Sequence, residues 1–222
     1  MEYLHWDEKI ITDFSEKAIT DMYERGYVFT RIGKGVMHQT RSVRIDLSKF
    51  ELSSENRRVL KKTEPLRIGI SPLPLPAYGI EIGKIGSDFY SAKFGKGIMS
   101  AFKIKEMVTD QSKSNFNALL NFAQAATAIG YAICYSNQKI LHYSYPFYDL
   151  KTSPKDMGLG MMIRAINFAK EAGMKYVYLG SLQRPTDTYK LQFVGLEWFD
   201  GGPNGLKKWS NDIEKVKKIL NE

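Results

Sequence analysis

Apolar and polar positions alternate along this 222-residue chain in patterns that predict both helices and strands. The clearest pattern lies between residues 147 and 180, where an apolar side chain recurs every three or four positions, the spacing of one helix face. The apolar positions of this stripe are Leu159, Met162, Ile163, Ile166 and Ala169. Gly173 follows at a place typical of a left-handed helix end, and a β-rich run from Tyr176 to Leu179 comes next. The segment predicts a strand, a loop, an amphipathic helix and a second strand.

The start of this helix has two interpretations. Ser153 could be the N-cap, followed by a first-turn proline and by Asp156 as the acid that completes the cap. Alternatively, residues 155–160 (KDMGLG) form a turn whose backbone N–H groups point at an anion, and Gly158 and Gly160 would cradle a phosphate. This turn is one substitution from the Q/R-x-x-G-x-G/A turn of the GNAT acyltransferases. A glycine pair at a helix start also serves turn geometry or close packing.

The N-terminal part predicts a helix over 15–25 and two strands over 27–32 and 36–45, joined by a glycine turn. The second strand is polar for a core element, and its side chains include Gln39 and Arg41. A solvated edge strand explains this polarity, and so does a strand that presents side chains to a ligand.

A basic helix is predicted after Ser53. Its cations are Arg57, Arg58, Lys61 and Lys62. They form either a solvated helix face or a patch for phosphates. Four prolines between Pro65 and Pro76 predict an extended segment. This segment marks the expected boundary between an N-terminal α/β subdomain of residues 1–64 and a second domain of residues 65–222.

The second domain predicts helices over 88–94 and 99–108, and a hairpin over 131–148. Residues 115–130 fit either a helix or paired strands, because short apolar runs do not decide by periodicity. A short turn or helix over 188–193 and a last strand over 197–199 come next, and a basic terminal helix is expected to be capped by Ser210.

Composition gives 32 Lys and Arg against 24 Asp and Glu, a net charge of +8. This balance favours a polyanionic partner, although many basic proteins bind no nucleic acid. The single Cys134 excludes an internal disulfide framework and a multi-cysteine metal site, and three distant histidines argue against zinc. Neither a signal peptide nor an apolar run of membrane-spanning length is evident, so we expect a cytoplasmic protein without a membrane partner.

Three separated segments carry motifs that occur together in one enzyme family. The first runs from Arg44-Ile45 through Phe50-x-Leu52-Ser53 to residues 57–62 (RRVLKK). The second contains residues 145–149 (YPFYD) and ends in residues 176–180 (YVYLG), and the third, over 189–197, reads Y-K-x-x-F-x-x-x-E. In order and spacing these segments resemble the C-terminal part of the arginyl-tRNA–protein transferases, and most closely their bacterial branch, the aspartate/glutamate leucyltransferases.

The resemblance implies a GNAT-like α/β fold: a mixed sheet with helices on both faces, which could occur twice in the chain. It also implies transfer of an amino acid from a charged tRNA to the α-amine of a protein N-terminus. The partners would be aminoacyl-tRNA and a protein or peptide acceptor, with no cofactor. Two features depart from the family. No cysteine precedes Arg44, where the family has a cysteine cluster, and the proline expected before Glu197 is missing. We therefore expect no metal, and the acceptor specificity does not carry over.

For this reaction the catalytic candidates lie at one strand end. Asp149 could orient the incoming ammonium or accept its proton, or it could simply cap the loop before Ser153. Tyr145 and Tyr148 could donate hydrogen bonds to the developing oxyanion, or they could be core aromatics with a wet hydroxyl.

The remaining candidates would hold the substrates. Tyr189 and Lys190 belong to the third motif, and Lys190 could bind an acidic acceptor side chain or the terminal tRNA phosphate, or be a surface lysine. Gln39, Arg41 and Arg57 could contact the acceptor or the 3′ adenosine. The expected contacts to the tRNA backbone are Arg58, Lys61 and Lys62.

Three rival functions remain open. The turn at residues 155–160 favours an acetyl-CoA-dependent GNAT N-acetyltransferase. The net charge alone would suit a tRNA-binding module without catalysis. The missing cysteine region would suit an aminoacyl-tRNA-dependent enzyme with a small-molecule or lipid acceptor.

Overall fold

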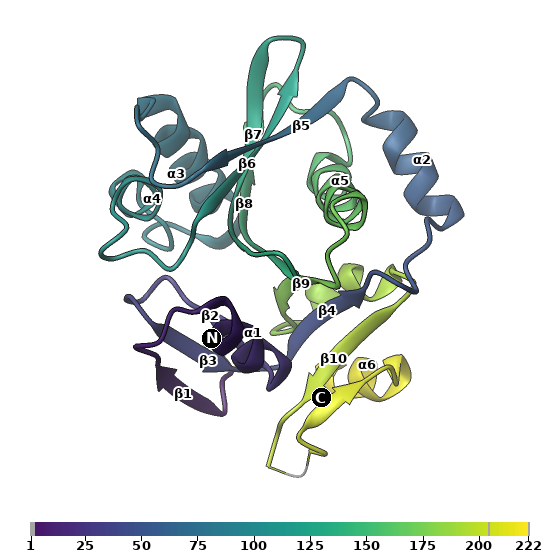
Figure 1. The fold of residues 1–222 in the computed structure, drawn as a ribbon. Coiled ribbons are helices and arrows are strands. Elements are labelled where there is room, and N and C mark those ends of the chain that lie inside the picture. The colour runs from purple at the N-terminus through teal and green to yellow at the C-terminus, as the bar shows by residue number, and fades with distance from the viewer. Residues whose placement is uncertain (1–2, 204, 222) are drawn as a thin grey trace. The chain divides into compact units, whose positions relative to one another are not determined.

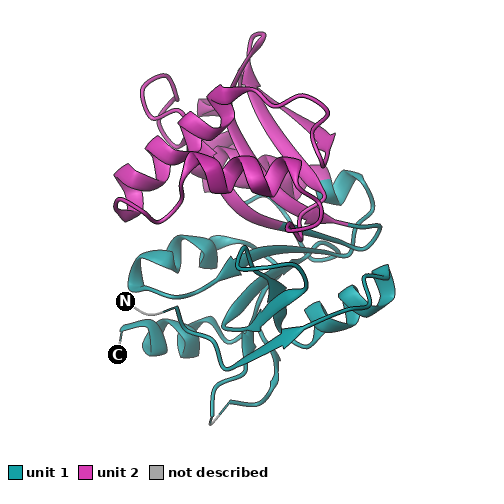
Figure 2. Cartoon of the chain, turned by 90° about the vertical axis from the view of Figure 1, so that its left-hand side faces the viewer, with its two compact units in different colours: residues 1–53, 137–142, 169–222 teal, residues 54–136, 143–168 magenta. Residues whose placement is uncertain are grey.

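A computed structural model describes residues 3–203 and 205–221, and these form two compact units that are not continuous in sequence (Figures 1 and 2). Unit 1 comprises residues 1–53, 137–142 and 169–222, and unit 2 comprises residues 54–136 and 143–168. The division into two domains, residues 1–64 and 65–222, stays a prediction.

Unit 1 begins with a three-stranded antiparallel sheet in the order β1 (Asp7–Ile10), β3 (Val36–Gln39) and β2 (Tyr27–Phe29). Helix α1 (Glu16–Glu24) precedes β2, and the Ser15 hydroxyl accepts a hydrogen bond from the N–H of Ala18 as its N-cap. The helix predicted over 15–25 is confirmed.

A second sheet in unit 1 has the order β11 (Lys208–Ser210), β10 (Leu196–Asp200), β4 (Ser42–Asp46) and β9 (Tyr176–Ser181). These strands are antiparallel, and β9 then pairs in parallel with residues Ile140–His142 of β8 (Ile140–Tyr148). The 3₁₀ helix η1 (Pro185–Gln192) connects β9 to β10, and helix α6 (Ile213–Asn221) follows β11. The cap predicted for Ser210 is wrong, because Asp212 accepts the N–H of Lys215 at the start of α6.

The polar strand predicted over 36–45 is two strands, and neither lies at an edge. β3 is the middle strand of its sheet, and β4 lies between β10 and β9. Buried polar side chains of this segment have partners within the protein. The hydroxyl of Thr40 donates to the carbonyl of Leu4, and the hydroxyl of Ser42 donates to the carbonyl of Gly26. The solvated-edge explanation is therefore wrong.

Unit 2 contains β5 (Leu66–Pro72), β6 (Ala118–Gln124), β7 (Thr127–Ser136) and the second part of β8, neighbours in the order β8-β7-β6-β5. The β6–β7 hairpin shows that the ambiguous residues 115–130 form paired strands. Helices α3 (Ile80–Phe94) and α4 (Ala101–Thr109) lie on one face of this sheet, and α5 (Met157–Glu171) lies on the other (Figure 1). Helix α2 (Ser54–Lys62) precedes β5.

Close packing holds these helices on the sheet. A Cβ on Gly86 of α3 would lie 2.3 Å from Ile104 and 3.2 Å from Phe147, and one on Gly130 of β7 would lie 2.9 Å from Met157 of α5. Glycine at both positions lets helix and strand backbones approach each other. The predicted α5 stripe is buried apart from the half-buried Leu159. Helix α5 ends as expected, because Gly173 has a left-handed φ of 73°.

The structure therefore confirms a mixed α/β fold with helices on both faces of the unit 2 sheet. A GNAT-like arrangement occurring twice stays a prediction. Within residues 3–203 and 205–221, none of the helices combines the length and the apolar character that a membrane crossing requires.

Candidate functional site

The end of β8 carries the three predicted catalytic residues, all in unit 2. Tyr145 is half-buried, and its ring meets that of Phe116 edge-on with centroids 5.3 Å apart. Tyr148 is half-buried between α3 and α5. Its ring centroid lies 4.8 Å from that of Phe89, and a Cβ on Gly158 would lie 3.4 Å from its Cε1 atom. Burial raises the pKa of Tyr148, so its hydroxyl remains a proton donor near neutral pH.

Asp149 begins the loop between β8 and α5. Its Oδ1 accepts the backbone N–H of Lys151 at 2.8 Å, and its Oδ2 accepts the hydroxyl of Thr152 at 2.8 Å. These two hydrogen bonds lower the pKa of Asp149, so the carboxylate is ionised at neutral pH. The loop-capping role is present, and the remaining lone pairs of the carboxylate leave room for a cationic group.

The start of α5 fits neither of the predicted arrangements fully. The helix begins at Met157, and the hydroxyl of Ser153 has no hydrogen-bond partner among the described residues, so Ser153 is not its N-cap. Asp156 has a left-handed φ of 67°, and its carbonyl accepts the N–H of Gly160. A Cβ on Gly160 would lie 2.7 Å from Oγ1 of Thr63, which gives this glycine a packing role. A phosphate-binding role for Gly158 and Gly160 stays a prediction.

The basic face of α2 is partly compensated by acids in unit 2. Arg58 forms an ion pair with Glu55 and lies 3.8 Å from Asp156, and Lys62 Nζ lies 3.2 Å from the same Asp156 carboxylate. Lys61 is exposed and makes no ion pair with any described residue. Arg57 is also exposed. The basic face therefore offers less free positive charge than the sequence alone suggests.

Gln39 and Arg41 lie in unit 1, at the end of β3 and just before β4. The Gln39 amide donates to the carbonyl of Arg25 at 2.8 Å. The guanidinium of Arg41 is half-buried and has no hydrogen bond or ion pair with another described residue, and burial lowers its pKa. Arg41 is the better placed of the two to contact a ligand.

Lys190 lies on η1 in unit 1 and is directed into the protein. Its Nζ donates to the carbonyl of Ser181 at 2.8 Å, and burial lowers its pKa. The neighbouring Tyr189 is exposed. Lys190 is therefore not the surface lysine that the alternative interpretation described.

A buried pair close to Lys190 was not predicted as part of the site. The Tyr23 hydroxyl and Nδ1 of His142 are 2.8 Å apart. Burial, together with the positive charge of Lys190, lowers the pKa of His142 to about 3, so the imidazole is neutral at physiological pH. The two residues are 119 positions apart, and no local sequence pattern indicates that they pair.

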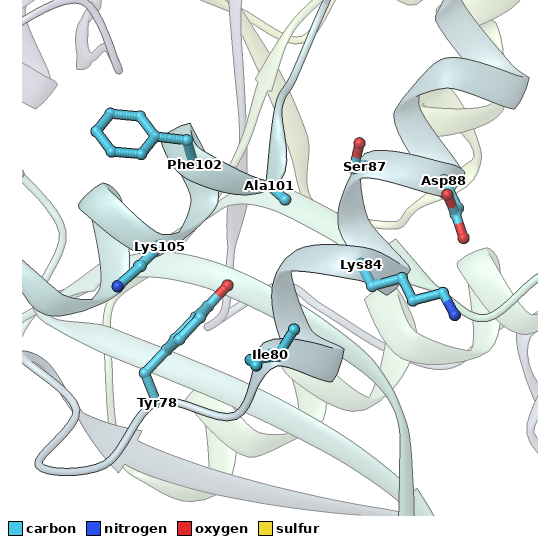
Figure 3. A pocket seen from close by; sticks show the side chains of 8 residues that line it. All are labelled: Tyr78, Ile80, Lys84, Ser87, Asp88, Ala101, Phe102 and Lys105. Atoms are coloured by element: carbon cyan, nitrogen blue, oxygen red, sulfur yellow. The ribbon is translucent and has the colours of Figure 1, made fainter.

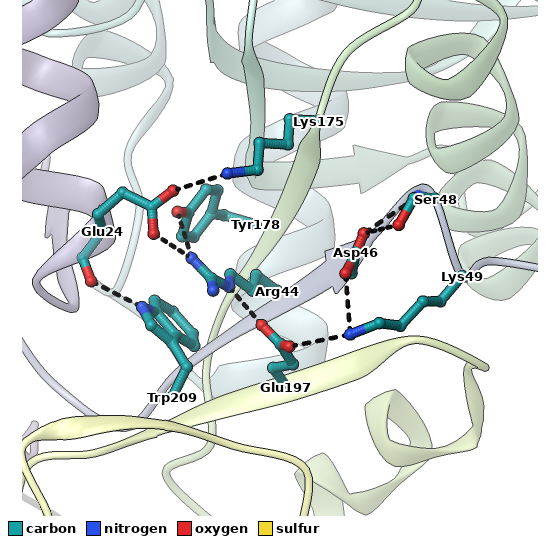
Figure 4. A network of polar contacts seen from close by, with 9 residues as sticks. All are labelled: Glu24, Arg44, Asp46, Ser48, Lys49, Lys175, Tyr178, Glu197 and Trp209. Atoms are coloured by element: carbon teal, nitrogen blue, oxygen red, sulfur yellow. Dashed lines mark hydrogen bonds and ion pairs between the residues drawn. The ribbon is translucent and has the colours of Figure 1, made fainter.

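Unit 1 also contains an ionic network around Arg44 (Figure 4). The sequence motifs include several of its residues but do not predict that they are in contact. Arg44 is buried on β4, with its side chain 6% exposed. Its Nε donates to Glu197 at 2.8 Å and its Nη1 to Glu24 at 2.7 Å. Burial alone would lower the pKa of Arg44, but Tyr178, Glu24 and Glu197 raise it above its usual value.

Aromatic rings and further charges complete this network. The Arg44 guanidinium carbon lies 3.9 Å from the ring centroid of Tyr176 and 4.1 Å from that of Trp209. Lys49 Nζ lies 3.0 Å from Asp46 and 3.7 Å from Glu197. Since Arg44 is already engaged by protein groups, the network stabilises unit 1 and offers no vacant cation to a substrate.

The structure distributes the candidates between the units. Tyr145 and Tyr148 of β8 and the following Asp149 belong to unit 2, which also contains Gly158, Gly160 and the α2 cations, whereas Gln39, Arg41, Tyr189 and Lys190 belong to unit 1. Among the described residues, no group of three or more His, Cys, Asp or Glu side chains is placed to hold a metal ion.

Comparisons with known proteins agree with the motif pattern. The family model described as "Arginine-tRNA-protein transferase, C terminus" matches residues 90–200, half of the chain. An aspartate/glutamate leucyltransferase of Ruegeria pomeroyi is 30% identical over 166 residues, and one of Dinoroseobacter shibae is 28% identical over 174 residues. Each match covers 72% of this chain and 60% of the relative's length.

Among solved structures, FemX matches with 8% identity and a TM-score of 0.49, over 93% of this chain and 71% of the FemX chain. The family model, together with the order of the three motifs, identifies the family. This chain belongs to the arginine-tRNA–protein transferase family through its C-terminal domain.

Proposed function

We propose that this protein transfers an aminoacyl group from a charged tRNA to the α-amine of a protein N-terminus. The observation that carries the proposal is the family match over residues 90–200, which includes the β8 end and α5. The relatives are named aspartate/glutamate leucyltransferases, and the matched region spans 60% of their length.

This reaction does not require a strong catalytic base. The 3′ ester of an aminoacyl-tRNA is already activated, and an α-amine with a pKa near 8 is neutral in roughly a tenth of molecules at pH 7. The enzyme has to hold the two substrates and stabilise the oxyanion that forms when the amine attacks the ester carbonyl. Positioning alone supplies about 7–11 kcal/mol in favourable reactions.

In this mechanism the Asp149 carboxylate attracts and orients the acceptor ammonium. The neutral amine, formed when one proton is lost to water, attacks the ester carbonyl, and Asp149 accepts the N–H proton that the tetrahedral intermediate releases. Its carboxylate is ionised at neutral pH, and both oxygens keep unused lone pairs beside the Lys151 and Thr152 hydrogen bonds. Tyr148, whose pKa is raised by burial, keeps the proton that it would donate to the oxyanion, and Tyr145 would assist. When the tetrahedral intermediate collapses, the bond between the carbonyl carbon and the ribose oxygen breaks, and the proton held by Asp149 passes to that oxygen.

Recognition is assigned to the other candidates. Arg41 has a half-buried guanidinium that is not paired with any described residue, and together with Gln39, Tyr189 and Lys190 it would hold the acceptor or the terminal adenosine. On α2, Arg57 would contact the acceptor or the 3′ adenosine, while Arg58, Lys61 and Lys62 would contact the phosphate backbone without reading sequence.

The test offers the purified chain a panel of charged tRNAs and peptides that begin with Asp, Glu or Lys, and follows peptide mass by mass spectrometry. We expect a mass gain of one amino-acid residue on at least one peptide. Uncharged tRNA is the matched control and should give none. No mass gain on any peptide, or acetylation when acetyl-CoA is supplied, would overturn the proposed function.

A further inference from the structure

A pocket in unit 2 lies between α3 and α4, away from the catalytic candidates in the sequence and outside the three motif segments (Figure 3). Its volume is about 510 Å³. The side chains that line it are Tyr78, Ile80, Lys84, Ser87, Asp88, Ala101, Phe102 and Lys105. An open pocket of this size is large enough for one nucleotide-sized group.

Apolar surface is unusually exposed around this pocket. Ile80 is 77% exposed and Phe102 is 73% exposed, the highest values among the large hydrophobic side chains that the structure describes. Neither residue therefore contributes much to the core of unit 2. A flat aromatic ring left open to water beside a pocket is a ready surface for stacking.

Tyr78 forms a fixed wall of the pocket. The Tyr78 hydroxyl lies close to the backbone of Gly83, because a Cβ at Gly83 would come within 2.2 Å of that oxygen. Glycine at position 83 is therefore what allows the ring to lie against α3. Lys105 Nζ is 5.8 Å from the centroid of the same ring. The ring and the ammonium group are thus already placed relative to each other before any ligand arrives.

The two lysines of the pocket have free charge. Lys84 and Lys105 are exposed, and neither forms an ion pair with another described residue. Lys103, two residues before Lys105, is by contrast paired with Glu106. Asp88 is the one acid in the lining, and its carboxylate can accept a hydrogen bond from the amino group of a base.

We propose that this pocket binds an unpaired nucleotide of single-stranded RNA. The base stacks on Phe102 and packs against Ile80, and the flanking phosphates pair with Lys84 and Lys105. An acidic peptide would also be attracted by the lysines, but it would meet the Asp88 carboxylate and would leave the Phe102 ring without a planar partner. The proposal rests on the proposed function, because an aminoacyl-tRNA donor is what would bring an unpaired RNA end to the protein.

The test measures binding of a fluorescently labelled single-stranded RNA of about six nucleotides to the full chain, over a series of salt concentrations. Lys84→Ala with Lys105→Ala should weaken binding about 10-fold at low salt and reduce the salt slope by about 1.4, since each single-strand phosphate contact contributes about 0.7. Lys93→Ala with Lys96→Ala removes the same charge from exposed positions outside the pocket and is the matched control.

Substitutions of Phe102 test stacking independently of charge. Phe102→Ala should weaken binding about 10-fold with no change in salt slope, Phe102→Leu should weaken it nearly as much, and Phe102→Trp should retain it. A double-stranded hairpin should not compete. If the pocket variants bind RNA as the unmodified chain does, or if they lose only binding of an acidic peptide, the proposal is wrong.

The transfer assay distinguishes this proposal from the proposed function. Transfer activity with unchanged RNA affinity in the pocket variants would overturn the nucleotide site and leave the function standing. RNA binding that depends on Phe102, without transfer to any peptide, would support the site and overturn the function.

Discussion

Arg44 and Glu197 lie directly opposite each other on β4 and β10, and Nε of Arg44 donates to Oε2 of Glu197 at 2.8 Å. The pair joins the first and the third motif segments, which are about 150 residues apart in sequence. On the other side of β4, Arg44 faces Tyr178, a residue of the second motif. The three motifs therefore meet at one buried guanidinium, and their shared occurrence has a structural cause.

Removing this guanidinium should destabilise unit 1 strongly. Arg44→Ala removes the buried cation of Glu24 and Glu197 and leaves them only the more distant and exposed Lys175 and Lys49. We expect a loss of about 3–5 kcal/mol in the free energy of unfolding. Arg44→Lys should still cost about 2 kcal/mol, because one ammonium cannot reproduce both hydrogen bonds and the stacking between Tyr176 and Trp209. Urea denaturation measures both.

The surface pair Lys17–Asp21 provides the control for Arg44. Its Nζ–Oδ2 distance is 2.9 Å, but both side chains are more than half exposed. Lys17→Ala should change stability by no more than about 0.5 kcal/mol. A loss below 1 kcal/mol for Arg44→Ala would contradict a stabilising role for the network.

The two glycines at the start of α5 should respond differently to alanine. A Cβ at Gly160 would meet Thr63 at 2.7–3.1 Å, whereas one at Gly158 would meet Tyr148 at an ordinary 3.4 Å. Gly160→Ala should therefore cost about 1–3 kcal/mol, and Gly158→Ala should be neutral or slightly stabilising because alanine favours the helix. Thermal unfolding with both variants measures this.

A second substitution separates packing from phosphate binding at Gly160. Thr63→Ala removes the two atoms nearest to the added Cβ, so the double variant should recover part of the loss, beyond what the two single changes predict together. Equal stability of the two glycine variants, with weaker donor binding only in Gly160→Ala, would instead favour the phosphate-cradling turn.

The buried His142 predicts how stability depends on pH. Its pKa falls from 6.5 to about 3 on folding, so the unfolded state binds one more proton between these values. The contribution of neutral His142 to the free energy of unfolding is therefore fully present above pH 6.5 and is lost as the pH falls below that value. Between pH 6.5 and about 5, where most carboxylates are still ionised, we expect a loss of about 1.5–2 kcal/mol.

His142→Gln should remove this part of the pH dependence, even if it lowers stability at pH 7. Denaturant titrations at several pH values give the slope directly. The exposed His5 provides the comparison, since His5→Gln should keep the slope of the unmodified chain. A slope that survives in His142→Gln would mean that other groups take up the proton.

Elements whose pattern repeats locally could be predicted from the sequence. Helix α5 and its end at Gly173 follow from the spacing of apolar residues and from one glycine, and both are present. Residues 115–130 could not be decided, because the β6–β7 hairpin depends on pairing between segments and not on periodicity. The same reason explains the polar strand: Thr40, Ser42 and Arg44 are buried because their partners come from distant parts of the chain.

In the candidate site too, local features could be predicted from the sequence, whereas contacts between distant residues could not. Asp149 was predicted at a strand end, and the structure places it there with a local turn that the sequence also allowed. The pairing of Tyr23 with His142 joins residues 119 positions apart and left no local signal. The pocket between α3 and α4 was not predicted, because the exposure of Phe102 and Ile80 depends on tertiary packing. The sequence pattern placed Phe102 in a helix over 99–108 and assigned Ile80 to no element.

Asp149→Asn tests the proposed role in transfer while keeping the loop. The asparagine side-chain oxygen still accepts the N–H of Lys151, so the unfolding free energy should change by less than about 1 kcal/mol. The negative charge that attracts the ammonium and takes its proton is lost, so kcat/KM for the peptide acceptor should fall about 100-fold. Asp110 provides a matched control in unit 2, because its Oδ1 accepts the N–H and the hydroxyl of Ser112 in a similar turn. Asp110→Asn should retain full activity, and equal rates for the two variants would reduce Asp149 to a loop cap.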